Sequence, residues 1–215
     1  MKKISFLFIL AACILVACSG GDSVANKMYE HLEKSVELEQ PFAEQQESFA
    51  DLEEKEQEVY NQIIELSSDQ MDEITDLSEQ AITNINERRE LLKKEKESID
   101  AGEKEFSKAK ELVKDLEDDL QGTAEKMVKA MEERYASYGN LNKAYQSSLD
   151  EDQKLYELFT KEELTEEELR SQIDKVNQTY EEVIQLNETF NKQTDTYNEL
   201  KKQFYEETEM NVVYE

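Results

Sequence analysis

The chain is poor in the residues that interrupt helices or build catalytic sites. Its 215 residues include one Pro, five Gly, one His, two Cys and no Trp. Glu, Lys, Gln and Leu dominate instead, which is typical of long helices with wide solvated faces. The sequence therefore predicts an all-α protein with little interior.

Enzyme signatures are scarce as well. There is no glycine-rich phosphate loop and no His-Glu-x-x-His motif, and the single His, His31, is expected to be a solvated helix residue. Asp150-Glu151-Asp152 does not fit a calcium loop, because Leu155 stands at the sixth position, where glycine is needed. We therefore expect no enzyme activity, no cofactor and no dedicated metal site.

Basic residues are too few for a nucleic-acid-binding protein. The chain has 52 acidic and 25 basic side chains and a formal charge of −27. Nucleic acid is bound by clustered Lys and Arg that neutralise phosphates, so the composition excludes it as a partner. Electrostatic adhesion to anionic lipid is excluded for the same reason.

The N-terminus has the pattern of a signal peptide. Lys2 and Lys3 precede an apolar run over residues 4–16. A helix that spans a bilayer needs about 20 apolar residues, so this run is too short to be a lasting membrane span. Residues 1–17 are therefore predicted to be a signal peptide that is removed.

The end of this segment, Leu15-Val16-Ala17-Cys18, resembles the lipobox of bacterial lipoproteins. The resemblance implies that the Cys18 thiol is acylated and that the signal is cut just before it; the alternative is a plain secretory signal with a chance cysteine. Two or three acyl chains anchor a protein stably. We therefore expect an extracytoplasmic protein that the lipid bilayer holds through Cys18 at the outer face of the cell membrane.

Cleavage would leave a more acidic chain with one cysteine. Loss of Lys2 and Lys3 leaves 23 basic against 52 acidic residues, a charge of 23 − 52 = −29. Residues 18–23 contain the lipidated Cys18 and a short flexible linker. Residues 24–210 are predicted to form a single elongated helical-bundle domain, and residues 211–215 a frayed tail.

The helical region is expected to be an antiparallel bundle or coiled coil of three long helices. Pro41 should bend or break the first helix near Gln40, and a hairpin should follow Leu66. From Met71 to Leu155 core positions recur every seven residues, which favours one helix over 70–160 of about 135 Å. The alternative is a turn at Gln121-Gly122-Thr123, which would give a four-helix up-and-down bundle.

The last helix has the clearest signals. Thr165 and Glu168 form a capping box, which predicts a helix start after a short break. A regular series of core positions then follows with alternating spacings of four and three, from Leu169 to Phe204.

Aromatic residues concentrate in the C-terminal half of the chain and allow two interpretations. Core packing is the simpler one, since several of the rings follow the heptad spacing. The other is contact with a glycan or partner, because exposed rings stack on sugar faces; its candidate residues are Tyr135, Tyr138, Tyr145 and Tyr156.

A lipobox, a glycine linker and about 190 residues of acidic helix with Tyr-rich heptads together resemble the YkyA-type family of cell-wall-binding lipoproteins. The resemblance implies wall association, with Cys18 as the residue that carries over. We expect a non-enzymatic wall-binding or spacer module whose partner is peptidoglycan or an envelope protein. The alternative is an assembly or regulatory protein for an envelope enzyme, and coiled-coil faces also permit self-association.

Overall fold

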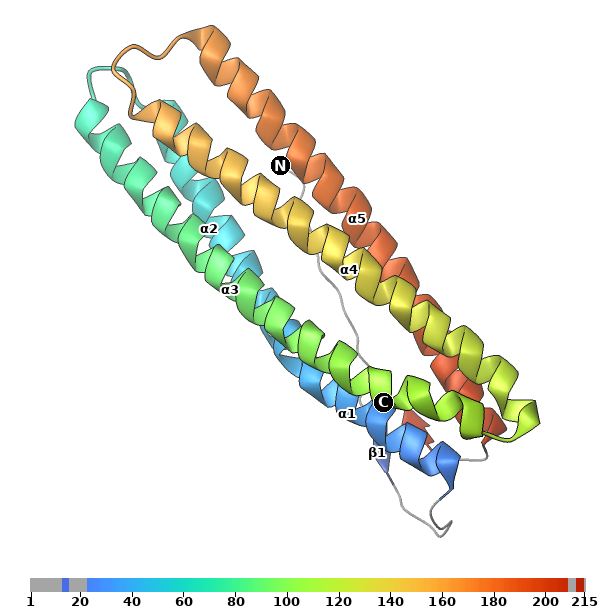
Figure 1. Cartoon of the computed structure of the whole chain (residues 1–215). Coiled ribbons are helices and arrows are strands. Elements are labelled where there is room, and N and C mark those ends of the chain that lie inside the picture. The colour runs from blue at the N-terminus through green and yellow to red at the C-terminus, as the bar shows by residue number, and fades with distance from the viewer. Residues whose placement is uncertain (1–12, 16–22, 209–211, 215) are drawn as a thin grey trace. The chain divides into compact units, whose positions relative to one another are not determined.

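The computed structural model describes residues 13–15, 23–208 and 212–214. Its long elements are five helices (Figure 1): α1 Val24–Glu44, α2 Gln46–Glu65, α3 Met71–Leu112, α4 Asp118–Phe159 and α5 Glu166–Glu207. A short 3-10 helix, Val113–Asp115, follows α3, and β1 Cys13–Leu15 pairs with β2 Val212–Tyr214. The prediction of an all-α antiparallel helical bundle is confirmed.

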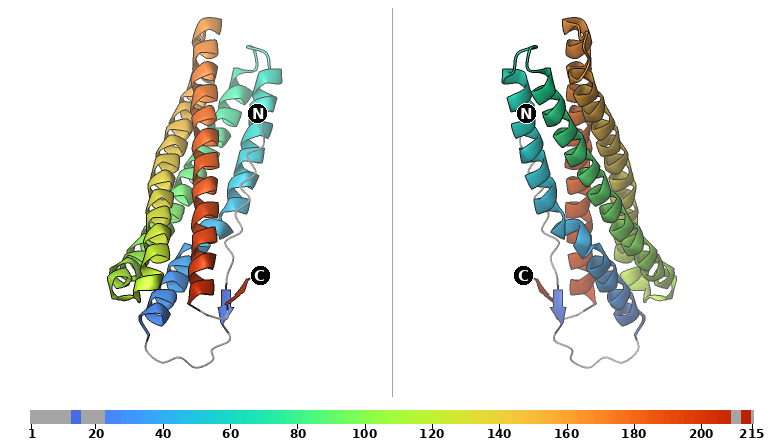
Figure 2. Two further views of the ribbon diagram at one scale, coloured as in Figure 1. Left: turned by 90° about the vertical axis from the view of Figure 1, so that its right-hand side faces the viewer. Right: turned by 90° about the vertical axis from the view of Figure 1, so that its left-hand side faces the viewer.

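The chain divides into two compact units, and α3, α4 and α5 each contribute to both. Among the described residues, unit 1 contains Glu44–Lys94 and Asn140–Asn187, and unit 2 contains residues 13–15, 23–43, 95–139, 188–208 and 212–214. Each unit therefore combines segments of four helices, with α2 in unit 1 and α1 in unit 2. In unit 1 the α2–α3 and α4–α5 connections lie at the same end (Figure 1). In unit 2 the start of α1, the α3–α4 connection and the end of α5 lie together (Figure 2).

The expected continuous helix over 70–160 is wrong, and the four-helix alternative is right. The break lies between Leu112 and Asp118 rather than at Gly122, which is inside α4. Leu116 has extended backbone angles, φ −71° and ψ 161°, and Val113 and Leu116 are both buried. Because these two side chains keep core positions through the turn, the heptad pattern continues across it and gave no sign of the break.

The first helical segment is interrupted four residues after Pro41. α1 continues through Pro41 to Glu44, and Gln45 separates it from α2. The predicted bend or break near Gln40 is thus displaced toward the C-terminus, because the helix makes one more turn after the lost hydrogen bond of proline.

Two predicted connections are confirmed. α3 begins at Met71 after a turn in which the Ser67 N–H donates to Gln70 Oε1 at 3.2 Å. α5 begins with the predicted capping box: the Glu168 N–H donates to Thr165 Oγ1 at 3.2 Å, and the Thr165 N–H donates to Glu168 Oε2 at 3.1 Å. Two free amides at the start of α5 are therefore satisfied by each other's side chains.

The predicted core face of α5 is also confirmed. Its deeply buried positions in unit 2 continue the four-and-three spacing: Phe190, Thr194, Tyr197, Lys201 and Phe204. No helix among the described residues is long and apolar enough to cross a membrane.

The expected frayed tail contains a strand. Val212–Tyr214 pairs antiparallel with Cys13–Leu15, and Ile14 faces Val213. β-branched residues suit an extended backbone, which accounts for the strand. Since β1 lies in the segment that we expect to be removed, we expect this pairing in the precursor alone.

Candidate functional site

The most distinctive chemistry of the described residues is a buried arginine in each unit. In unit 1, Arg88 of α3 is fully buried. Its Nη2 forms an ion pair with Glu56 of α2 and lies 3.3 Å from Asp152 Oδ2 of α4. Its Nη1 donates to the hydroxyl of Tyr180 on α5 at 3.2 Å, so four helices meet at one guanidinium.

Tyrosine hydroxyls complete this group, which we call the Arg88 cluster. Tyr180 donates to Asp152 Oδ2 at 2.7 Å, and Tyr156 donates to Glu56 Oε1 at 3.1 Å. At its edge Tyr145 donates to Oε1 of the half-buried Glu53 at 2.7 Å. The Arg88 cluster therefore consists of Glu53, Glu56, Arg88, Tyr145, Asp152, Tyr156 and Tyr180.

Burial raises the pKa values of the acidic side chains in this cluster. It raises the pKa of Asp152 to about 7, helped by the negative charge of Glu56 and opposed by Arg88 and Tyr180. Burial also raises the pKa of Glu56 and of Glu53. The carboxyl groups of this cluster thus hold their protons more tightly than carboxyls in water do.

In unit 2 the buried arginine is Arg134 of α4. Its Nη2 lies 2.7 Å from Glu39 Oε2 of α1, and its Nε donates to Thr194 Oγ1 of α5 at 3.1 Å. The guanidinium carbon also lies 5.0 Å from the ring centre of Phe190, close enough for a cation–π contact. Tyr135 donates to Glu39 Oε1 at 2.8 Å. We call Glu39, Arg134, Tyr135 and Thr194 the Arg134 cluster.

Gly102 of α3 has no Cβ, and the side chain of Glu39 occupies the space where that atom would lie. A Cβ at Gly102 would lie 2.6 Å from Glu39 Cγ, closer than any real contact. Ser35 of α1 fixes the same approach, since its hydroxyl donates to the Gly102 carbonyl at 3.0 Å. The helix–helix contact is therefore built around the missing side chain.

Electrostatics keep the Arg134 cluster charged. Burial lowers the pKa of Arg134, but the charge and hydrogen bond of Glu39 outweigh it, so the pKa stays above the ordinary value. Burial and the charge of Glu39 raise the pKa of Tyr135. The Arg134 guanidinium therefore stays positive beside Glu39, and the Tyr135 phenol next to them stays neutral.

The four tyrosines considered for glycan contact belong to the core. Tyr135, Tyr138, Tyr145 and Tyr156 are between 1% and 7% exposed. The hydroxyls of Tyr135, Tyr145 and Tyr156 bind buried or half-buried carboxylates, and the Tyr138 ring packs against Phe42 and Phe190. Their ring faces are covered by protein, so in this structure they offer no stacking surface to a sugar.

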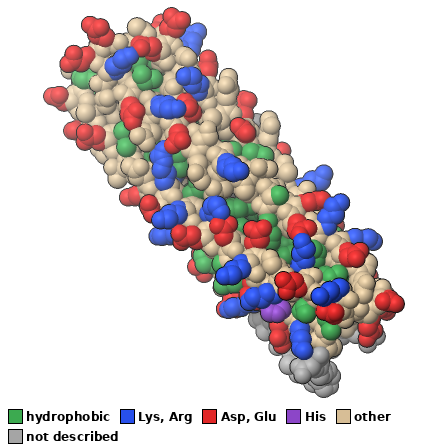
Figure 3. Space-filling view, in the orientation of Figure 1, with side chains coloured by type: hydrophobic (Ala, Val, Ile, Leu, Met, Phe, Trp, Pro, Cys, Tyr) green, Lys and Arg blue, Asp and Glu red, His purple; other side chains and the backbone are tan. Residues whose placement is uncertain are grey.

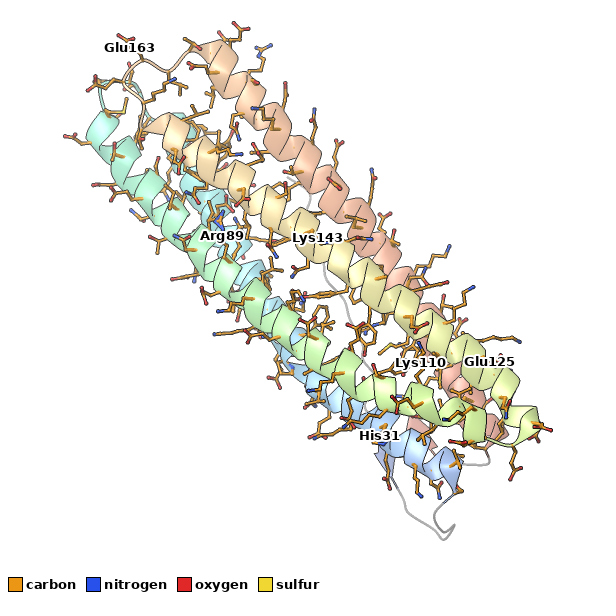
Figure 4. The ribbon with its side chains drawn as sticks, in the orientation of Figure 1. His31, Arg89, Lys110, Glu125, Lys143 and Glu163 are labelled. Carbon is orange, nitrogen blue, oxygen red and sulfur yellow. The ribbon has the colours of Figure 1, made fainter. Side chains whose placement is uncertain are left out.

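The other residues singled out in the sequence have ordinary partners. His31 lies on α1 (Figure 4) and is half-buried rather than fully solvated, with its Nδ1 2.7 Å from Glu105 Oε1 of α3. Asp150, from the acidic run, accepts a hydrogen bond at 2.5 Å from Nη2 of Arg89, which Figure 4 labels. No group of three or more metal-ligating side chains occurs in the described part of the chain.

The residue predicted to be lipidated, Cys18, precedes α1 in the sequence. Cys18, with Val16 and Ala17 of the lipobox, lies outside the described residues, while Leu15 ends β1. The first helix starts at Val24, where the Asn26 N–H donates to Ser23 Oγ at 3.1 Å. The predicted linker over 18–23 therefore ends at a helix cap.

Sequence reasoning missed Arg88 and Arg134 as the centres of two clusters. Both stand at heptad core positions of the predicted helices: Arg88 follows the fully buried Ala81 by seven residues, and Arg134 follows the fully buried Met127 by seven. A long charged residue at such a position must find a buried partner, because an isolated charge is too costly to bury. The charge at a core position was the available signal; the partners, 32 and 95 positions away for Glu56 and Glu39, were not in the pattern.

Comparison with known proteins gives a family. A family model described as "YkyA: Putative cell-wall binding lipoprotein" matches residues 23–207. The "Uncharacterized lipoprotein YkyA" of Bacillus subtilis (strain 168) is 37% identical over 200 residues, which are 93% of this chain and 89% of that protein.

A solved structure has a similar fold. The crystal structure of a conserved protein of unknown function from Staphylococcus aureus matches with a TM-score of 0.75 over 88% of this chain and 97% of the other, at 16% identity. At that identity the likeness concerns the fold alone. Because the family model matches residues 23–207 and the Bacillus relative is 37% identical, the chain belongs to the YkyA family of lipoproteins.

Proposed function

We propose that the protein is a non-enzymatic lipoprotein, anchored through Cys18 to the outer face of the cell membrane, that binds the cell wall. The observation that carries the proposal is the lipobox, Leu15 to Cys18, directly before a helical region that matches a family described as cell-wall binding. A tether of five residues, 19–23, then joins the lipid to α1.

The buried clusters support a binding rather than a catalytic role. Arg88 and Arg134 are at most 1% exposed, and their acidic partners are buried with them. A general acid or base has to come within hydrogen-bond reach of a substrate. These groups instead bind one another and hold helices together.

The surface supports wall binding that depends on cations. The face in Figure 3 carries interspersed acidic and basic side chains, and the whole chain has a net charge of −27. A wall that contains anionic polymers would repel such a surface unless divalent cations bridge the two. We therefore place wall contact on the exposed helix faces and expect Mg²⁺ to strengthen it.

A role as partner of an envelope enzyme has less support. Docking of a partner on a helix face needs an exposed apolar stripe. Among the described residues, Ile64 is the exposed large apolar side chain, at 56%. One such residue does not make a docking patch.

The test is co-sedimentation of the unlipidated fragment 19–215 with purified wall, with and without teichoic acid and with and without Mg²⁺. We expect binding that increases with Mg²⁺. The same chain after thermal unfolding keeps its charge and is the control for non-specific adhesion. Failure of the folded chain to bind wall in all four conditions would rule out direct binding.

A further inference from the structure

The two buried clusters differ in their charge balance. In unit 2, Arg134 faces one carboxylate, Glu39, at 2.7 Å. In unit 1, the single Nη2 of Arg88 contacts two carboxyls, Glu56 and Asp152, and the side chains of both are at most 8% exposed. With both acids ionised, the core of unit 1 would hold a net charge of −1, and Glu53 at its edge would add another.

No other cation within the cluster offsets this excess. The groups that face Arg88 of α3 come from the three other helices: Glu53 and Glu56 from α2, Tyr145, Asp152 and Tyr156 from α4, and Tyr180 from α5. Burial raises the pKa of Tyr145, Tyr156 and Tyr180, so these phenols stay neutral and act as hydrogen-bond donors. An uncompensated charge in such a place is costly, and a carboxyl there takes up a proton instead.

We propose that the Arg88 cluster is a protonation site: one proton resides on Asp152 or Glu56 in the folded protein, and its loss to solvent as the pH rises loosens the packing of unit 1. The raised pKa of Asp152, about 7, agrees with the geometry. The inference is independent of wall binding.

The sign of the effect follows from the raised pKa. Between the ordinary value of an aspartate, 3.8, and about 7, the folded chain holds a proton that the unfolded chain has lost. Each unit of pH in this window therefore increases the unfolding equilibrium constant, by up to tenfold for one proton. In the Arg134 cluster of unit 2 the arginine faces one carboxylate, Glu39, so that cluster carries no such excess of negative charge.

The test is a pH series on the full chain with three variants. Asp152→Asn and Glu56→Gln each remove one titrating acid and keep hydrogen-bonding atoms in place, and Asp174→Asn makes the same charge change at an exposed position of α5. Urea unfolding between pH 4.5 and 8 should be less pH-dependent in the first two variants, and Asp174→Asn should follow the wild type. Hydrogen exchange should place the loosening at α2 rather than α1.

A direct titration needs no folded variant. Carbon-13 NMR of wild-type protein labelled at the carboxyl carbons of Asp and Glu should show a step near neutral pH, which the paired acids share. Titration of all carboxyls below pH 5, or an unchanged pH dependence of unfolding in a folded Asp152→Asn variant, would overturn the proposal.

Discussion

Arg88 and Arg134 occupy positions that an apolar residue would fill in a simple helical bundle. Each pairs with acids and hydroxyls from other helices, so neither charge is left alone. A buried ion pair adds little net stability compared with apolar packing, but loss of one partner leaves a buried charge. The effect of a substitution in these clusters therefore depends on whether one partner or both are removed.

Glu39→Gln removes the partner of a charge that is 1% exposed. We expect it to lower the free energy of unfolding by roughly 3–5 kcal/mol, because Arg134 stays charged and buried. Urea denaturation measures this change. The control is Glu37→Gln on the same helix, whose carboxylate is 63% exposed and pairs with Lys34; its effect should lie within about 0.5 kcal/mol. Equal losses in the two variants would contradict the role of Glu39.

Gly102→Ala tests the close approach of α1 to α3. The new Cβ would meet Glu39, which Arg134 and Tyr135 hold in place, so we expect a loss of about 1–3 kcal/mol despite the better helix propensity of alanine. Gly122→Ala in α4 is the matched control, since a Cβ there meets nothing within 4 Å. It should stabilise the protein by about 0.5–1 kcal/mol. A gain in both variants would show that the contact has room.

For single residues, the sequence predicted which of them are buried better than it predicted which residues they contact. The heptad series places Arg88 and Arg134 at core positions, and the structure buries both. Which acid meets which arginine depends on the pairing and register of helices far apart in the chain. That information is not periodic, so the pattern did not contain it.

Among the elements, the connections between helices differ in how clearly the sequence predicts them. The capping box at the start of α5 uses a Thr and a Glu three residues apart, and such a pair is visible in the sequence. The break between α3 and α4 has neither glycine nor proline within residues 113–117. It depends on Leu116 in an extended conformation and on acidic residues, Asp118 and Asp119, in the first turn of α4.

Thr165→Ala should shorten or loosen the start of α5. The variant loses the bonds of the Thr165 hydroxyl with Glu168, at a cost of about 1 kcal/mol. Thr196→Ala is the control, because Thr196 lies exposed within α5 and its hydroxyl bonds only to its own helix. Thermal denaturation compares the two.

The same cap has a pH dependence of opposite sign to that of the Arg88 cluster. Hydrogen bonds to Lys161 and Thr165 lower the pKa of Glu168 to about 2. The contribution of this carboxylate is therefore complete above its ordinary value of 4.5 and is lost as the pH falls toward 2. The difference between wild type and Thr165→Ala should shrink below pH 4; an unchanged difference at pH 2 would contradict this.

For the whole molecule, the proposal to test first is attachment to the membrane through Cys18. Cys13 lies within the predicted signal peptide and Cys18 at its end. Cys18→Ala should abolish fatty-acid labelling and membrane retention, while Cys13→Ala should leave both unchanged, because Cys13 is removed with the signal. Metabolic labelling followed by membrane fractionation separates the outcomes. Continued labelling of the Cys18→Ala protein would show that another residue carries the lipid.

The helices have a common length. α3, α4 and α5 each contain 42 residues, and α1 with 21, α2 with 20 and Gln45 between them span the same number. Forty-two residues make six heptads, so every helix ends in the phase in which it began. An insertion of seven residues in one helix alone would add about two turns whose core positions have no facing helix to pack against. Family members of different size should therefore have gained or lost whole heptads in all four segments together.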